Sequence, residues 1–133
     1  MTIKAIFFDL YGTLAGFTPS RFEIQSSACE RFNLYPTPEG ILKGYATADQ
    51  FMTKQNTVMP VRKMDEEEAF NFFCEYERLV LSGSDIKVSV EEAGKIWNYI
   101  KTISYDLSIY QDVIPVLSDL KSQGVKIGLL SNM

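Results

Sequence analysis

The sequence predicts an α/β fold in which a bundle of helices is inserted into part of a Rossmann-like parallel sheet. Two short runs, at residues 3–8 and 125–130, consist almost entirely of apolar side chains, a pattern typical of strands buried on both faces of a parallel sheet. The interval between them far exceeds the length of one crossover and carries several helical periods. With 133 residues and 46% hydrophobic content, the chain has the length of about one domain, ~100–200 residues.

Turn and polar residues mark the ends of both predicted strands. The first strand ends at Asp9, and Gly12 follows within a tight loop. In the second strand, Gly128 indicates a close approach of another backbone segment. We therefore assign residues 1–15 and 111–133 to the sheet core and residues 16–110 to a helical cap.

Capping residues mark the starts of the helices. One helix is expected over residues 19–33, and the next begins with Thr37 as N-cap and Pro38 at its first helical position. A further helix begins at Ser89, where Ser-Val-Glu-Glu offers a capping box. The last, over residues 112–123, is the crossover that leads into the second strand.

Apolar side chains recur at helical spacing in two segments. A helix is predicted over residues 65–81, with an apolar face of Ala69, Phe72, Phe73, Tyr76 and Val80. The helix that starts at Ser89 carries a second such face, formed by Ala93, Ile96, Trp97, Ile100 and Ile103. We expect the two faces to pack together. Helical spacing also favours core packing over a substrate pocket for the concentrated aromatic residues, which are Phe70, Phe72, Phe73, Tyr76, Trp97 and Tyr99.

Composition excludes several classes of function. A net charge of −4 argues against nucleic-acid binding, and the sequence has neither a secretory signal nor an apolar run long enough to span a membrane. The absence of histidine removes histidine-based triads and the usual zinc sites. Cys29 and Cys74 are too far apart for metal-ligand spacing, so we expect buried free thiols in a cytoplasmic protein.

The candidate chemistry lies where the two strands end. In an open parallel sheet, ligands bind beyond the carboxyl ends of the strands. A right-handed crossover would bring Asp9 to the same edge as Ser131 and Asn132. A carboxylate placed there could act as a nucleophile.

Two motifs at these positions resemble those of a known family. FFDLYGTL at 7–14 resembles the first motif of the haloacid dehalogenase-like hydrolases, and IGLLSN at 127–132 resembles their second. The resemblance implies a small-molecule substrate, a haloacid or a phosphomonoester, and covalent catalysis by Asp9. It also implies that Ser131 and Asn132 hold the substrate's phosphoryl or carboxylate group. Thr13 and the backbone around Gly12 would shape the loop that aims the nucleophile.

Position 11 departs from the family pattern and leaves two activities open. The family's phosphatases carry a second aspartate there as a general acid, whereas this chain has Tyr11, whose reference pKa near ~10 makes it a poor acid. A halide leaving group needs no proton, which favours a 2-haloacid dehalogenase without a cofactor. The alternative is a phosphatase whose Mg²⁺ is held by Asp9 and the main-chain carbonyl of Tyr11.

The family's third-motif lysine and fourth-motif acidic residues have no counterpart in the sequence. Lys43, Lys54, Arg21 and Arg31 do not match the family's positions. We therefore expect a truncated chain with little or no turnover of its own. A third hypothesis is a non-catalytic module that self-associates through exposed strand edges or needs a separate C-terminal half.

Overall fold

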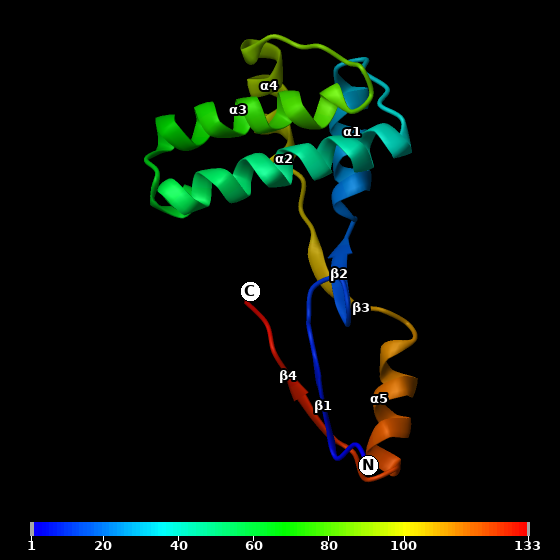
Figure 1. Cartoon of the computed structure of the whole chain (residues 1–133). Coiled ribbons are helices and arrows are strands. Elements are labelled where there is room, and N and C mark those ends of the chain that lie inside the picture. Colours follow the sequence, from blue (N-terminus) through cyan, green and yellow to red (C-terminus); the bar gives the residue numbers. More distant parts are fainter. Residues whose placement is uncertain (1, 133) are drawn as a thin grey trace. The chain divides into compact units, whose positions relative to one another are not determined.

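The computed structural model describes residues 2–132 and divides the chain into two compact units. The strand unit combines the two ends of the chain, up to Ser20 and from Tyr105 onward, whereas the helical unit is Arg21–Ser104. Figure 1 shows the strands with one helix in the first unit and the remaining helices in the second. None of the helices among the described residues is long and apolar enough to cross a membrane.

The strand unit contains a two-stranded parallel sheet and a crossover helix. β1 (Ala5–Phe8) pairs with β4 (Lys126–Leu129) from Ala5 opposite Lys126 to Phe8 opposite Leu129. α5 (Val113–Ser122) precedes β4 and packs against it. Gly124 takes the turn between them with a φ of +78°, a conformation that suits glycine. The prediction of two neighbouring parallel strands and a crossover helix is confirmed.

A second, antiparallel pair of strands was not predicted from the sequence. β2 (Ala15–Thr18) pairs with β3 (Asp106–Ile109), and the hydroxyls of Thr18 and Ser108 are 2.6 Å apart. This pairing assigns residues 16–20 and 105–110 to the strand unit, whereas the sequence analysis assigned residues 16–110 to the helical cap.

The expectation that the parallel strands are buried on both faces is wrong for the described residues. Phe7 is 65% exposed and Leu129 is 53% exposed. An apolar run shows that the side chains are hydrophobic, not that they are covered. A two-stranded sheet with one helix packed against it has too few neighbouring elements to bury both of its faces. At Gly128 the nearest neighbour is the ring of its strand partner Phe7, 2.5 Å from an added Cβ, so a side chain and not another backbone segment makes the closest approach.

The helical unit holds four α-helices and one short 3-10 helix. They are α1 (Arg21–Arg31), α2 (Pro38–Val58), η1 (Val61–Lys63), α3 (Glu66–Ser82) and α4 (Val90–Ile100). Thr37 caps α2 by accepting a hydrogen bond from the Gly40 amide, as predicted. Reciprocal capping boxes start α3 at Asp65 and α4 at Ser89, and each satisfies amides that the helix leaves without partners.

The cores of the helical unit form where the apolar helix faces meet. Figure 1 shows α2 and α3 side by side, and they approach so closely that a Cβ on Gly44 would lie 1.9 Å from the Val80 carbonyl oxygen. Between α3 and α4, the Phe73 and Trp97 rings stack with centroids 4.0 Å apart. The predicted packing of these two faces is therefore confirmed. Cys29 and Cys74 are buried free thiols in the same core, also as predicted.

Candidate functional site

The loop after β1 is a tight turn that begins at Asp9. The Gly12 amide donates to the Ala15 carbonyl at 2.8 Å, and the Ala15 amide donates to the Leu10 carbonyl at 3.0 Å. Gly12 has a φ of +79°, and no atom lies within 4 Å of an added Cβ. Backbone conformation, not space, therefore requires glycine here. Within the turn, the Thr13 hydroxyl donates to Asp9 Oδ2 at 3.2 Å, so the loop gives the candidate nucleophile a hydrogen-bond partner.

Ser131 and Asn132 follow β4 at the same end of the parallel pair. The Leu130 amide donates to the Phe8 carbonyl at 2.9 Å, so the two chains still run together one residue beyond the strands. Asp9 and Ser131 both come directly after this point, and both are exposed, as is Asn132. Parallel strands bring their carboxyl ends to one edge, which is where a hydroxyl and an amide could bind an anionic group near a carboxylate.

Tyr11 makes an aromatic contact with β2. Its ring centroid lies 5.0 Å from that of Phe17, and Phe17 in turn packs edge-on against Tyr105. The side chain is 39% exposed. The Tyr11 ring therefore packs against the aromatic side chain of β2.

A small cavity of about 130 Å³ lies in the strand unit beside Thr13. Its lining residues come from β1, the loop and α5, and are Phe8, Thr13, Leu14, Asp112, Val113, Val116 and Leu117. Ligand pockets usually measure ~300–1,000 Å³, so this cavity alone is too small for a substrate. It does place Asp112 near the candidate site, whereas the sequence predicted this residue only as the start of a helix. The Asp112 side chain makes no capping bond.

Few groups in the strand unit could hold a metal ion. Across residues 2–132, no three Cys, Asp or Glu side chains come together as a metal cluster. Mg²⁺ often binds through only one or two carboxylates and keeps its remaining ligands as water and substrate phosphate. Of the two ligands expected from the sequence, Asp9 and the main-chain carbonyl of Tyr11, only Asp9 could supply charge to such a sparse set.

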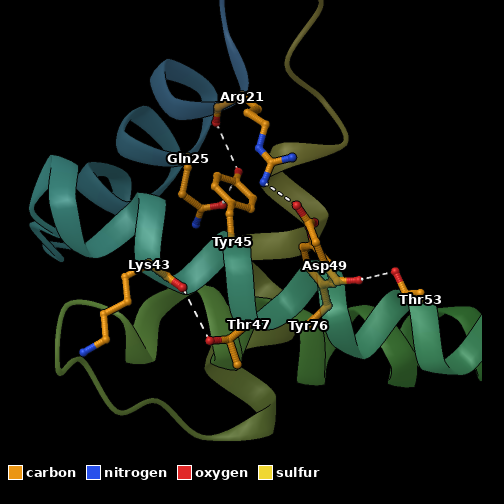
Figure 2. Close-up of polar contacts among 8 residues, drawn as sticks. All are labelled: Arg21, Gln25, Lys43, Tyr45, Thr47, Asp49, Thr53 and Tyr76. Atoms are coloured by element: carbon orange, nitrogen blue, oxygen red, sulfur yellow. Dashed lines mark hydrogen bonds and ion pairs between the residues drawn. The ribbon is translucent and has the colours of Figure 1, made fainter. Parts of the chain in front are cut away.

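The helical unit contains a polar network centred on Arg21 (Figure 2). Arg21 donates to Asp49 at 2.9 Å, and its guanidinium carbon lies 3.6 Å above the centre of the Tyr45 ring. Tyr76 donates to the other Asp49 oxygen at 2.6 Å. Burial lowers the pKa of Arg21, but the hydrogen bond and charge of Asp49 outweigh this effect and raise it. Arg21 is thus engaged with partners of its own unit.

Two buried polar side chains extend this network into the core. Gln25 and Glu77 are each 1% exposed, and Gln25 donates to a Glu77 carboxylate oxygen. Tyr45 donates to Gln25 Oε1 at 3.2 Å. Burial raises the pKa of Glu77 to about 7, although the Gln25 hydrogen bond acts in the opposite direction. Glu77 was not predicted from the sequence, because the helical spacing of apolar residues carries no sign of a buried carboxyl.

The other cations considered from the sequence lie apart from this network. Lys43 extends away from it in Figure 2, Lys54 lines an open hollow along α2, and Arg31 is exposed at the end of α1. Neither the family models nor the curated proteins compared with this chain give a match.

Proposed function

We propose that the chain carries the nucleophile of a haloacid dehalogenase-like hydrolase, with Asp9 as the attacking group and the helical unit as its cap. The observation that carries this proposal is the parallel pairing of β1 and β4. It brings Asp9 and the Ser131-Asn132 pair to the same end of two strands. The Thr13 hydroxyl bound to Asp9 supports it further, because a nucleophile must be held in a defined orientation.

The proposed reaction has two steps. One Asp9 oxygen attacks C2 of a 2-haloalkanoate, and an ester bond forms as the carbon–halogen bond breaks and halide leaves with the electron pair. Water then adds to the Asp9 acyl carbon and the ester bond breaks. The 2-hydroxyalkanoate leaves, one proton passes to solvent, and the carboxylate is restored.

Dehalogenation is favoured over phosphate transfer because of Tyr11. A phosphomonoester needs a proton for its leaving alkoxide, and the Tyr11 ring packs against Phe17. A halide leaves without a proton. In the phosphatase alternative, Mg²⁺ held by Asp9 and the Tyr11 carbonyl would neutralise charge on the phosphoryl group.

A covalent assay tests the nucleophile directly. The chain is incubated with 2-chloropropionate, released chloride is measured, and the modified residue is located by peptide mass spectrometry. We expect an ester of propionate C2 on Asp9, at no more than one per chloride released because water hydrolyses the ester, and no such adduct in Asp9→Asn. An adduct on Cys29 or Cys74 alone, or chloride release that survives in Asp9→Asn, would contradict the proposal.

A parallel assay separates the two activities. p-Nitrophenyl phosphate is supplied with and without Mg²⁺, using the same chain and the same Asp9→Asn control. Release that requires both Mg²⁺ and Asp9, without chloride release in the first assay, would replace the dehalogenase by the phosphatase. Because the chain is expected to turn over little on its own, the covalent adduct is the decisive readout. If no ester forms on Asp9 and p-nitrophenol is not released either, the hydrolase proposal is wrong.

The strand edges support a second candidate, a module that self-associates. Phe7, Ile127, Leu129 and Leu130 are exposed on or beside the two-stranded sheet, and such apolar edges favour pairing with another strand. Sedimentation across a range of concentrations tests this. A concentration-dependent dimer that is lost in Leu129→Lys is expected, whereas a monomer at every concentration would exclude this candidate.

A further inference from the structure

A hollow of about 440 Å³ opens between the first half of α3 and the C-terminal half of α4. It is lined by Glu66, Ala69, Phe70, Phe73, Trp97 and Lys101. Its volume falls within the ~300–1,000 Å³ typical of small-molecule pockets. Every lining residue belongs to the helical unit, so the hollow is independent of the Asp9 loop.

Aromatic rings form one wall of this hollow. Phe73 and Trp97 stack nearly parallel, with an angle of 11° between their planes. The Phe70 ring covers Gly94 so closely that a Cβ there would lie 2.7 Å from the ring. Because these contacts fix the rings, the wall is preformed and a flat ligand could pack on it at little conformational cost.

The aromatic wall is only partly used by the protein core. Phe72 and Ile96, the neighbours of Phe73 and Trp97 in sequence, are buried, whereas Phe73 and Trp97 are half-buried. The helical spacing that predicted core packing therefore holds for one side of each helix. At the hollow, the rings of Phe73 and Trp97 pack against each other but keep part of their apolar surface accessible.

One cation and one anion border the wall. Burial raises the pKa of the Cys74 thiol, and the charge of Lys101 lowers it by a smaller amount. Among residues 2–132, neither Lys101 nor Glu66 takes part in an ion pair. By contrast, Lys95 on the same helix pairs with Glu91 at 2.8 Å. The hollow therefore offers one charge of each sign together with apolar surface.

We propose that this hollow binds a small zwitterionic compound with an aromatic ring. The ring packs against Trp97 and Phe73, the carboxylate of the ligand pairs with Lys101, and its ammonium group pairs with Glu66. A ligand with both charges satisfies both protein groups. A singly charged ligand leaves one protein group without a partner and brings its own charge near a group of like sign.

The chain contains one tryptophan, Trp97, so its fluorescence reports directly on the hollow. Three probes of similar size separate the charges: phenylalanine carries both, phenylacetate carries the anion, and phenethylamine carries the cation. We expect phenylalanine to change the fluorescence saturably and at lower concentration than either other probe. Lys101→Met should weaken phenylalanine binding by up to about fivefold, the upper range for an exposed ion pair of ~1 kcal/mol.

Lys95→Met is the matched control, because it removes an exposed cation from the same helix outside the hollow. It should leave phenylalanine binding unchanged, and circular dichroism checks that both variants keep their helices. Equal binding of all three probes would overturn the proposal, as would equal effects of Lys101→Met and Lys95→Met. The absence of a saturable response to phenylalanine, in fluorescence and in ligand-observed NMR, would overturn it too.

Discussion

The two units of the molecule differ in how they use apolar side chains. All of the buried apolar residues among those described, except Ala15 and Val113, belong to the helical unit. In the strand unit, large side chains such as Phe7, Leu129 and Leu130 stay exposed. Since burial of apolar surface is the main stabilising contribution, the helical unit holds most of the stability. The strand unit carries the candidate chemistry on exposed groups, so stability and activity can be altered separately.

The largest expected effect concerns activity alone. Asp9→Asn removes the proposed nucleophile, and we expect chloride release to fall by at least ~10³-fold, a loss typical of removing a covalent catalytic group. Asp9 is exposed and accepts one hydrogen bond from Thr13, so stability should change by no more than ~0.5 kcal/mol. Chloride assays and thermal unfolding measure the two quantities. Asp119→Asn, an exposed aspartate on α5, should change neither of them.

Next in size is the effect of a core truncation in the helical unit. Leu81 is fully buried against the α1, α3 and α4 core, and Leu81→Ala should lower the free energy of unfolding by ~2–5 kcal/mol. Leu130→Ala makes the same chemical change at an exposed position of the strand unit and should cost less than ~0.5 kcal/mol. Denaturant titration followed by circular dichroism compares the two variants. Equal losses would abolish the contrast between the units.

The pH dependence of stability should also be specific to the helical unit. Burial raises the pKa of Glu77 from 4.5 to about 7, so between these values the folded chain retains a proton that the unfolded chain has released. The free energy of unfolding therefore falls as pH rises, by ~1.4 kcal/mol per pH unit and about 3 kcal/mol in total. This contribution is fully present below pH 4.5 and lost above about 7.

Glu77→Gln removes the titrating group and should flatten the fall in stability between pH 4.5 and 7. Glu67→Gln, an exposed position of the same helix, should leave the slope intact. Denaturant titrations at several pH values measure both. A slope in Glu77→Gln as steep as that of the unmodified chain would assign the effect to other groups.

Much of the helical unit is encoded locally, and the structure agrees with the sequence there. Thr37, Asp65 and Ser89 mark helix starts because each must satisfy free amides within three residues. β2 and β3 were missed because neither has the nearly continuous apolar run that marked β1 and β4. Gly16 and Thr18 interrupt the apolar residues of β2, and Asp106 and Ser108 interrupt those of β3.

The candidate site was predictable only in part, for a similar reason. Gly12 was expected to shape the loop and has a positive φ there, and the parallel pairing that places Asp9 was expected from the crossover. Asp112 beside Thr13, and the Gln25–Glu77 pair, arise from tertiary contacts. The residue types and their spacing in the sequence do not show which residues become neighbours in the fold.

The smallest expected effect compares two helix starts, one in each unit. Ser89 accepts a hydrogen bond from the Glu92 amide, so Ser89→Ala should lower the free energy of unfolding by ~1 kcal/mol. The Asp112 side chain makes no such bond, so Asp112→Ala should lower the free energy of unfolding by only a few tenths of that amount. Thermal unfolding with matched conditions resolves the difference. An equal cost would mean that the side chain of Asp112 stabilises α5 by another contact.

A single turnover in ¹⁸O-labelled water tests the central claim, that Asp9 is a covalent nucleophile. With the chain in excess over 2-chloropropionate, the oxygen transferred to the product comes from Asp9, and the water oxygen replaces it in the carboxylate. We predict an unlabelled hydroxyl in the first product and ¹⁸O in the peptide that contains Asp9. A labelled hydroxyl in the first product, with Asp9 unlabelled, would mean that water attacks the substrate directly and would contradict this mechanism. Failure to form either the product or an ester on Asp9 would contradict it as well.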